Sequence, residues 1–306
     1  MLYRLFICFA ALILVFGCGP AGNKSSNGKL KVVSTVGMIR DAVAEVGGEH
    51  VESIGLMGPG VDPHLYRATA GDVQKLESAD IVFYGGLELE GRMTDIFVKM
   101  AGRGVPTYSV SEGIPVSKLR EPPEFHGKFD PHVWFDVTLW KHAVETMRDG
   151  LIKARPELRA EFEKNSKVYL EKLDELHQYV QAESEKVPED QRVLVTAHDA
   201  FGYFGRQYGF EVIGIQGTST ATEAAAGSLR SIAETIARRK VKAIFVESSV
   251  PPATIEALQQ AIKSRGWQVK IGGQLFSDAM GKDGTPEGTY IGMVRHNIDT
   301  IVGALK

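Results

Sequence analysis

The sequence is poor in cysteine: among 306 residues only Cys8 and Cys18 carry a thiol, and both lie near the N-terminus. The chain after Cys18 therefore cannot form internal disulfides, cysteine-ligated zinc sites, iron–sulfur clusters or a thiol nucleophile. An excess of positive charge is also missing, because the formal net charge is -3 at pH 7. Without a cationic field, binding to nucleic acid is not expected.

A hydrophobic run long enough to span a bilayer is missing as well. The apolar run at residues 5–16, LFICFAALILVF, is shorter than the ~20 residues of a membrane-spanning helix. Its length and the preceding Arg4 are typical of a secretory signal. The glycine before Cys18, with an aliphatic residue three positions before the cysteine, resembles the lipobox of bacterial lipoproteins, in which the cysteine is acylated.

This resemblance implies a lipoprotein signal peptide at residues 1–17 and a flexible lipid tether at residues 18–28. Cys18 would then be the lipidation site and the first residue of the mature chain. The body of the protein would lie outside the cytoplasmic membrane, in the periplasm or at the outer face of the membrane. An uncleaved anchor helix is the alternative.

The remaining chain has a globular composition, with 43% hydrophobic and 24% charged residues, and its length favours two domains. Short β-branched runs alternate with helical periodicity, which predicts an α/β fold with mainly parallel sheets. Strands are expected at residues 31–35, 51–56, 81–84, 105–108, 193–196, 212–215, 243–247 and 269–271. Helices are expected at residues 39–46, 70–77, 92–101, 202–208, 223–239, 252–265 and 291–305.

Two long helical stretches, residues 137–154 and 157–186, lie between these sets of elements. A helix of about 30 residues would be about 45 Å long, too long for one small domain. We therefore expect an N-terminal lobe at residues 29–155, a linking helix at residues 156–187 and a C-terminal lobe at residues 188–306. A helical hairpin packed on one domain is the alternative.

Polar residues that follow strands are the candidates for ligand binding, because open α/β sheets bind ligands beyond the carboxyl ends of their strands. Four such residues are His64, His132, His198 and Asp278. Together they would form a nitrogen-rich site for a divalent first-row metal, without soft sulfur for copper(I) and with too few oxygens for calcium. The alternative for each histidine is an ordinary surface or packing role.

Neighbouring residues supply further expectations. A proline before His64 and before His132 stiffens the backbone that presents each imidazole. Acidic residues nearby are candidates for orienting the imidazoles, although each could equally be an ordinary cap or surface acid: Asp62, Asp130, Asp199 and Glu247. Aromatic residues are expected to enclose the site and fill the core: Trp134, Trp140, Phe201, Tyr203 and Phe204.

Five stretches resemble the cluster A-I metal-binding solute-binding proteins of ABC importers, and within them the TroA-like zinc and manganese lipoproteins. They are MGPGVDPHLY (57–66), FDPHVWFD (129–136), VLVTAHDAFGYF (193–204), IFVESS (244–249) and LFSDAMG (275–281). The resemblance implies two α/β lobes joined by one long helix, with metal bound at their interface. The matching ligands are His64 and His132 from the N-terminal lobe, and His198 and Asp278 from the C-terminal lobe.

The resemblance also bears on the choice of metal. Manganese-selective members carry glutamate at the position of His198, so this sequence favours zinc, with manganese as the alternative and iron as a further candidate. Zinc-specialised members often carry a long His- and Asp-rich loop between the first two ligands. The corresponding residues 121–128 are few and contain only His126, which argues against high-capacity zinc scavenging.

The expected function is therefore that of a non-enzymatic receptor, which captures a divalent metal outside the membrane and delivers it to ABC permease subunits. We expect a monomer held at the membrane by its lipid anchor, with no nucleic-acid partner. The alternatives are a metalloenzyme, such as a superoxide dismutase with three histidines and one aspartate, and an adhesin.

Overall fold

A computed structural model describes residues 28–125, 127–221 and 226–306. Cys8, Cys18, the expected signal peptide and nearly all of the tether lie outside the described residues, and so does His126.

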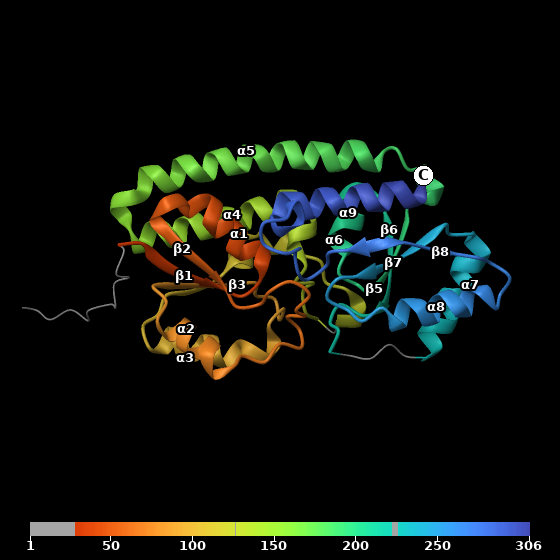
Figure 1. The fold of residues 1–306 in the computed structure, drawn as a ribbon, viewed down its shortest axis with the longest axis horizontal. Coiled ribbons are helices and arrows are strands. Elements are labelled where there is room, and N and C mark those ends of the chain that lie inside the picture. Colours follow the sequence, from red (N-terminus) through yellow and green to blue (C-terminus); the bar gives the residue numbers. More distant parts are fainter. Residues whose placement is uncertain (1–27, 126, 222–225) are drawn as a thin grey trace, which may run out of the picture.

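The first half of the chain forms one four-stranded parallel sheet with strand order β2-β1-β3-β4. Its strands are β1 (Leu30–Ser34), β2 (Val51–Gly55), β3 (Ile81–Tyr84) and β4 (Thr107–Ser109). Helices cover both faces, with α1 (Gly37–Gly47) on one side and α2 (Ala70–Glu77) and α3 (Thr94–Gly102) on the other (Figure 1). Because the strands are parallel, their carboxyl ends meet at one edge, which faces the second half of the molecule.

The second half repeats this layering with two parallel strand pairs, β5-β6 and β7-β8, and with β5 beside β7. The strands are β5 (Val193–His198), β6 (Glu211–Gln216), β7 (Ala243–Glu247) and β8 (Lys270–Leu275). The helices are α6 (Gly202–Tyr208), α7 (Ala226–Arg239), α8 (Ala253–Lys263) and α9 (Tyr290–Leu305). The expected α/β class with parallel sheets is confirmed.

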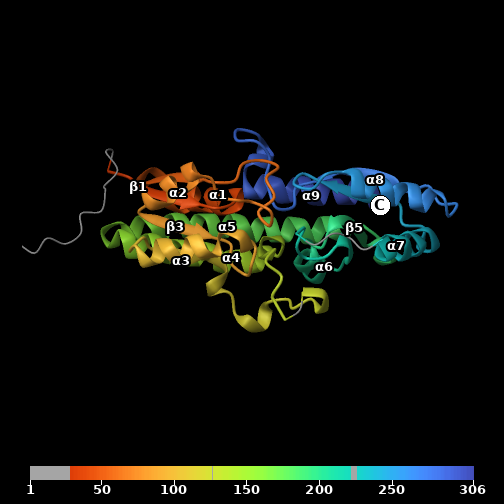
Figure 2. The same ribbon diagram turned by 90° about the horizontal axis from the view of Figure 1, so that it is seen from below.

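A long helix runs beside both halves. After α4 (Val137–Ala154) and a short 3-10 turn, α5 (Arg159–Ser184) runs along the first half and reaches beside the near part of the second (Figures 1 and 2). Lys172 on α5 pairs with Glu45 on α1 at 3.0 Å. Further along α5, the Tyr179 hydroxyl donates to Asp299 on α9 at 2.7 Å. The expected long helix is confirmed, and it ends at Ser184, slightly before the predicted residue 186.

One hydrophobic core extends through both halves of the molecule. It joins residues of the first sheet, of α4 and α5, and of α6 and α9, among them Phe83, Trp140, Leu173, Phe201 and Tyr290. A second core lies in the C-terminal half around β5, α7 and α8, and includes Val195, Ile236 and Leu258. The two halves therefore share apolar packing as well as a linking helix. Within the described residues, no helix is both long and apolar enough to cross a membrane.

Two strands near the expected ligands are longer than predicted. Strand β5 continues beyond residue 196 to His198, which pairs with Gln216 of β6, so His198 is a strand residue and not a loop residue. Strand β8 starts at Lys270 and continues to Leu275, although two glycines at its centre weaken the sequence signal for a strand. The two expected ligands of the second half are therefore placed by strands, with His198 at the end of β5 and Asp278 three residues after β8.

Candidate metal centre

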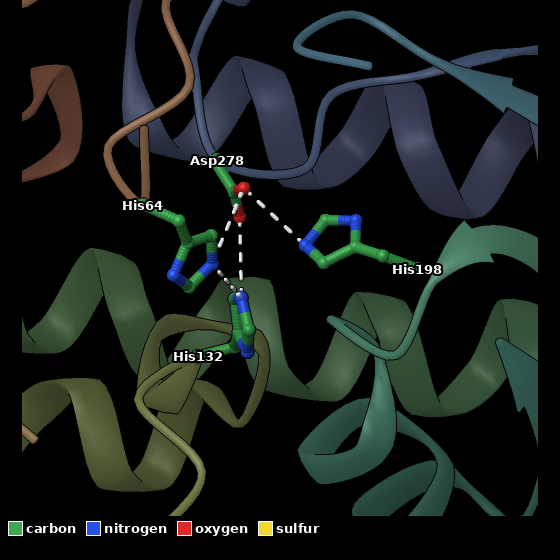
Figure 3. Close-up of side chains that lie close together, drawn as sticks. All are labelled: His64, His132, His198 and Asp278. Carbon is green, nitrogen blue, oxygen red and sulfur yellow. Dashed lines mark hydrogen bonds and ion pairs between the residues drawn. The ribbon is translucent and has the colours of Figure 1, made fainter. Parts of the chain in front are cut away.

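The four expected ligand side chains meet between the two halves (Figure 3). Their potential ligand atoms all lie within 4.8 Å of one another. His64 comes from the loop after β2, His132 from the turn before α4, His198 from the end of β5, and Asp278 from the loop after β8. All four are buried, with 4% of His64 exposed and 1% or less of each of the others.

The two Asp-Pro-His segments fold into the same local turn. The Asp62 carboxylate accepts a hydrogen bond from the backbone N–H of His64 at 2.8 Å, and Asp130 does the same for His132 at 3.0 Å. This bond to the residue two positions ahead is characteristic of an Asx turn. The intervening proline fixes φ, so the turn presents each imidazole from a constrained backbone.

Two of the imidazoles are also held by carboxylates. The Nδ1 atom of His132 lies 2.8 Å from Asp130 Oδ1, and Nδ1 of His198 lies 2.6 Å from Glu247 Oε2. Because an ionised carboxylate only accepts, each ring donates through Nδ1 and turns Nε2 toward the other ligands. Two of the expected orienting acids therefore contact an imidazole directly.

The other two acids have different contacts. Asp62 Oδ1 binds the backbone of His64, and its Oδ2 accepts from the Thr220 hydroxyl at 2.6 Å. The backbone N–H of Asp199 bonds the carbonyl groups of Gln216 and Gly217, where the chain leaves β5.

The separations of the ligand atoms fit a small tetrahedral cage. His64 Nε2 lies 3.3 Å from His132 Nε2. The carboxylate of Asp278 lies 3.3 Å from Nε2 of both His132 and His198, and 3.7 Å from Nε2 of His64. A tetrahedron with metal–nitrogen bonds of about 2.0–2.1 Å has edges of about 3.3–3.4 Å. Three of these four separations match the edges of such a tetrahedron, the fourth is 3.7 Å, and all the ligand atoms lie within 4.8 Å of one another.

Several atoms that face this cage are buried without a hydrogen-bond partner. They are both carboxylate oxygens of Asp278 and the Nε2 atom of His198. Buried polar groups are nearly always paired, because an unpaired group loses its interaction with water without compensation. A divalent cation at the centre would satisfy these atoms together, so the residues present fit a metal.

The buried residues of the site differ in how strongly they favour the charged form. Burial lowers the pKa of His64 to about 3 despite the nearby Asp278. Burial opposes charge on His132 too, but its hydrogen bond to Asp130 and the nearby carboxylate of Asp278 outweigh it and raise its pKa to about 9. Burial disfavours the Asp278 anion, yet the His198 and His132 rings hold the pKa of Asp278 well below its usual range. The site therefore provides a carboxylate anion surrounded by imidazoles, and protons compete with a metal for them.

Aromatic side chains enclose the cage on the His132 side. The Trp134 ring meets the His132 ring edge-on, with centroids 5.3 Å apart, and its Nε1–H donates to the carbonyl of Ser277 at 3.1 Å. Phe135 stacks on Phe201 at 4.2 Å. Trp140 instead stacks on Tyr290 at 5.3 Å, in the core between α4 and α9.

Sequence reasoning missed two residues that reach the orienting acids. Arg120 forms an ion pair with Asp130 Oδ2, and Thr220 donates to Asp62. Both contacts depend on tertiary structure: Arg120 precedes Asp130 by a loop, and Thr220 comes from the opposite half. Neither position carries a local signal that would identify it.

Comparison with known proteins identifies the family. A model of the family described as zinc-uptake complex component A, periplasmic (ZnuA), matches residues 32–304. The chain belongs to this family. Its relatives include the zinc-binding protein TroA of Treponema pallidum, which is 52% identical over 305 residues, covering 99% of this chain and 98% of TroA. The manganese-binding lipoprotein MntA of Bacillus subtilis is 48% identical over 302 residues, covering 98% of this chain and 97% of MntA.

The fold of this ZnuA-family chain is also that of a solved relative. The periplasmic zinc binding protein TroA from Treponema pallidum superimposes with a TM-score of 0.88 at 54% sequence identity, covering 91% of this chain and 99% of that chain. The resemblance to the cluster A-I metal-binding solute-binding proteins of ABC importers is confirmed.

Proposed function

We propose that this protein is the extracytoplasmic solute-binding component of an ABC importer, which captures zinc or manganese and delivers it to the membrane permease. His64, His132, His198 and Asp278 would hold the metal. The observation that carries this proposal is the buried cage, in which three imidazoles and one carboxylate from both halves are spaced for a small divalent cation. Family membership supports the transport role.

We infer that zinc binds more tightly than manganese. Three nitrogen donors and one carboxylate favour zinc in the general affinity order of divalent metals, whereas manganese prefers oxygen donors. The relatives named above include one named for zinc and one named for manganese. Occupancy in the cell would then depend on the free concentrations of the two metals as well as on affinity. Iron, which binds imidazole and carboxylate too, is a weaker candidate.

The burial of the ligands supports a receptor over an enzyme. A catalytic metal keeps a coordination position open for water or substrate. Here four protein side chains surround the centre, and the most exposed of them, His64, is only 4% accessible. A superoxide dismutase would need a route for its substrate to the metal, and an adhesin would not need the cage.

We further propose that capture and release involve the two lobes predicted from the sequence, residues 29–155 and 188–306, with the long helix α5 limiting their movement. Two ligands come from each lobe, so separation of the lobes would divide the ligand set. One chain would be enough to hold the metal, because all four ligands belong to one polypeptide, and we propose that it works as a monomer.

Metal binding by the purified protein tests the proposal directly. Protein purified without chelators should contain about one zinc or manganese per chain, and the metal-free form should bind either metal in a calorimetric titration. His198→Ala and Asp278→Ala should each weaken binding strongly while leaving the circular dichroism spectrum unchanged, since each removes one ligand. Wild-type affinity in both variants would refute the ligand assignment, and sustained dismutase turnover would refute the receptor role.

Membrane attachment through Cys18 has its own test. Radioactive palmitate should label the protein in cells, and Cys18→Ser should abolish both labelling and retention in the membrane fraction. Cys8→Ser is the matched control, because Cys8 lies within the expected signal peptide and should not affect the mature protein. Undiminished labelling of the Cys18 variant would contradict lipid attachment at this residue.

A further inference from the structure

The hydroxyl of Tyr203, on helix α6 of the C-terminal half, joins two separate parts of the N-terminal half. It accepts a hydrogen bond from the backbone N–H of Arg120 at 3.0 Å. It also donates to the carbonyl oxygen of Asp130 at 2.9 Å. The side chain of Tyr203 is fully buried, as is Asp130. One hydroxyl of the second half therefore fixes both ends of the surface loop that separates Arg120 from Asp130.

Arg120 completes this arrangement with two further contacts to the same aspartate. Its carbonyl oxygen accepts from the backbone N–H of Asp130 at 2.9 Å, and its guanidinium forms an ion pair with Asp130 Oδ2. The guanidinium lies directly over Gly202, the residue before Tyr203, where any Cβ would overlap it. The chain thus provides a glycine on α6 at the point where Arg120 passes over the helix.

Asp130 is the residue through which these contacts reach the metal site. Its Oδ2 atom forms the ion pair with Arg120, while its Oδ1 atom accepts hydrogen bonds from the backbone N–H and the Nδ1 of His132. In the other half, Glu247 on β7 and His198 at the end of β5 belong to the same half, and the Glu247 carboxylate contacts both the backbone N–H and the Nδ1 of His198. The carboxylate that orients His132 is therefore held by Arg120 of its own half, and the backbone at both members of this ion pair is bonded to Tyr203 of the other half.

We propose that Tyr203 is a positioning residue for the metal ligand His132, acting through Arg120 and Asp130. The inference rests on the proposed function and adds a route by which the relative position of the two halves controls metal binding. When α6 lies against the loop, Asp130 is fixed and His132 points at the metal. A movement of α6 away from the loop would remove the hydroxyl and loosen the Arg120–Asp130 pair, so that His132 would be held less firmly and metal release would be faster.

The decisive comparison is between two tyrosines of the same helix. Tyr203→Phe removes only the hydroxyl and keeps the buried ring. Tyr208→Phe is the matched control, because Tyr208 is also buried on α6 but its hydroxyl lies 3.2 Å from Nδ1 of His177 on α5 and does not contact Arg120 or Asp130. The measurement is the rate at which each zinc-loaded protein transfers its metal to an excess of a colorimetric chelator.

We expect Tyr203→Phe to release zinc several-fold faster than wild type. The effect should be smaller than the ~10–100-fold loss that follows removal of a direct hydrogen-bond partner of a metal ligand, because Tyr203 acts on His132 only through Arg120 and Asp130. Tyr208→Phe should remain within about twofold of wild type. The visible absorption spectrum of the cobalt(II)-loaded protein supplies a second reading, since a general loss of stability would not alter coordination geometry. It should change for Tyr203→Phe and stay unchanged for Tyr208→Phe.

Gly202→Ala tests the same route without altering the hydroxyl. The added methyl group should push the guanidinium of Arg120 from its place, and release should again be at least several-fold faster. If Tyr203→Phe fails to fold, the zinc release rate of Gly202→Ala alone tests the proposal. Equal release rates for Tyr203→Phe, Tyr208→Phe and wild type would overturn the proposal, as would an unchanged rate for Gly202→Ala. A wild-type protein that binds no metal would instead refute the proposed function.

Discussion

The imidazole rings of His132 and His198 lie with their centroids 5.2 Å apart, although they come from opposite halves of the molecule. Each ring is held through Nδ1 by an acid of its own half, Asp130 for His132 and Glu247 for His198. The two histidines are therefore oriented by carboxylates outside the expected ligand set, and the site is complete only where the halves meet.

Removing the charge of either orienting acid should weaken metal binding. Asp130→Asn and Glu247→Gln should each lower zinc affinity about 10–100-fold, because an amide is a weaker acceptor and no longer fixes the imidazole. Competition with a fluorescent zinc chelator measures the effect. Asp80→Asn is the control, since Asp80 accepts from the backbone of Lys31 at the start of β1. Equal affinity in all three variants would show that these acids do not support the ligands.

Much of this arrangement could be predicted from sequence, for reasons that differ between residues. Short apolar, β-branched runs predict strands β3 and β7 from local sequence alone, and the observed bounds of both strands match the prediction. The positions of His64 and His132 follow from prolines that constrain their turns. The end of β5 was harder to place, because Thr196-Ala197-His198 has a weak strand signal and only pairing with β6 extends the strand to His198. Contacts between halves, such as Arg120 with Gly202, have no local signal at all.

Exchanging the third ligand should shift the preference between metals. His198→Glu alone places two carboxylates together, because Glu247 lies against this position. The double variant with Glu247→Gln avoids that repulsion and replaces a nitrogen donor by an oxygen donor. Its ratio of zinc to manganese affinity should fall at least tenfold below that of wild type, since manganese favours oxygen ligands. Parallel titrations with both metals measure the ratio.

Glu247→Gln alone is the control for this exchange. It should weaken binding of both metals to a similar degree, because all four ligands remain. A double variant that retains the wild-type preference for zinc would show that the third ligand does not set the choice of metal.

Asp41 should make the stability of the metal-free protein depend on pH. Its carboxylate on α1 accepts from the backbone N–H of Tyr290, the first residue of α9. Burial raises the pKa of Asp41 from 3.8 to about 6, and this outweighs the bond to Tyr290. The folded state therefore favours the protonated acid. Its contribution to stability is present below pH 3.8 and is lost as the pH rises through about 6.

Asp41→Asn should remove this dependence, because the amide carries no charge and still offers an oxygen to Tyr290. Between pH 3.5 and 7.5, the free energy of unfolding of the variant should rise relative to wild type by about 2–3 kcal/mol. Urea unfolding with a chelator present, at several pH values, measures the difference. Asp95→Asn, an exposed acid in the first turn of α3, is the control. A constant difference across the pH range would contradict the assignment.

The proposed function requires one metal ion among His64, His132, His198 and Asp278. A crystal structure of protein purified without chelators, with anomalous diffraction recorded at the zinc and manganese absorption edges, tests it most directly. We expect one strong anomalous peak between the two halves, within about 2.0–2.2 Å of a donor atom from each of the four residues. A metal-loaded protein with no peak at this position, or with its peak elsewhere, would refute the proposed site.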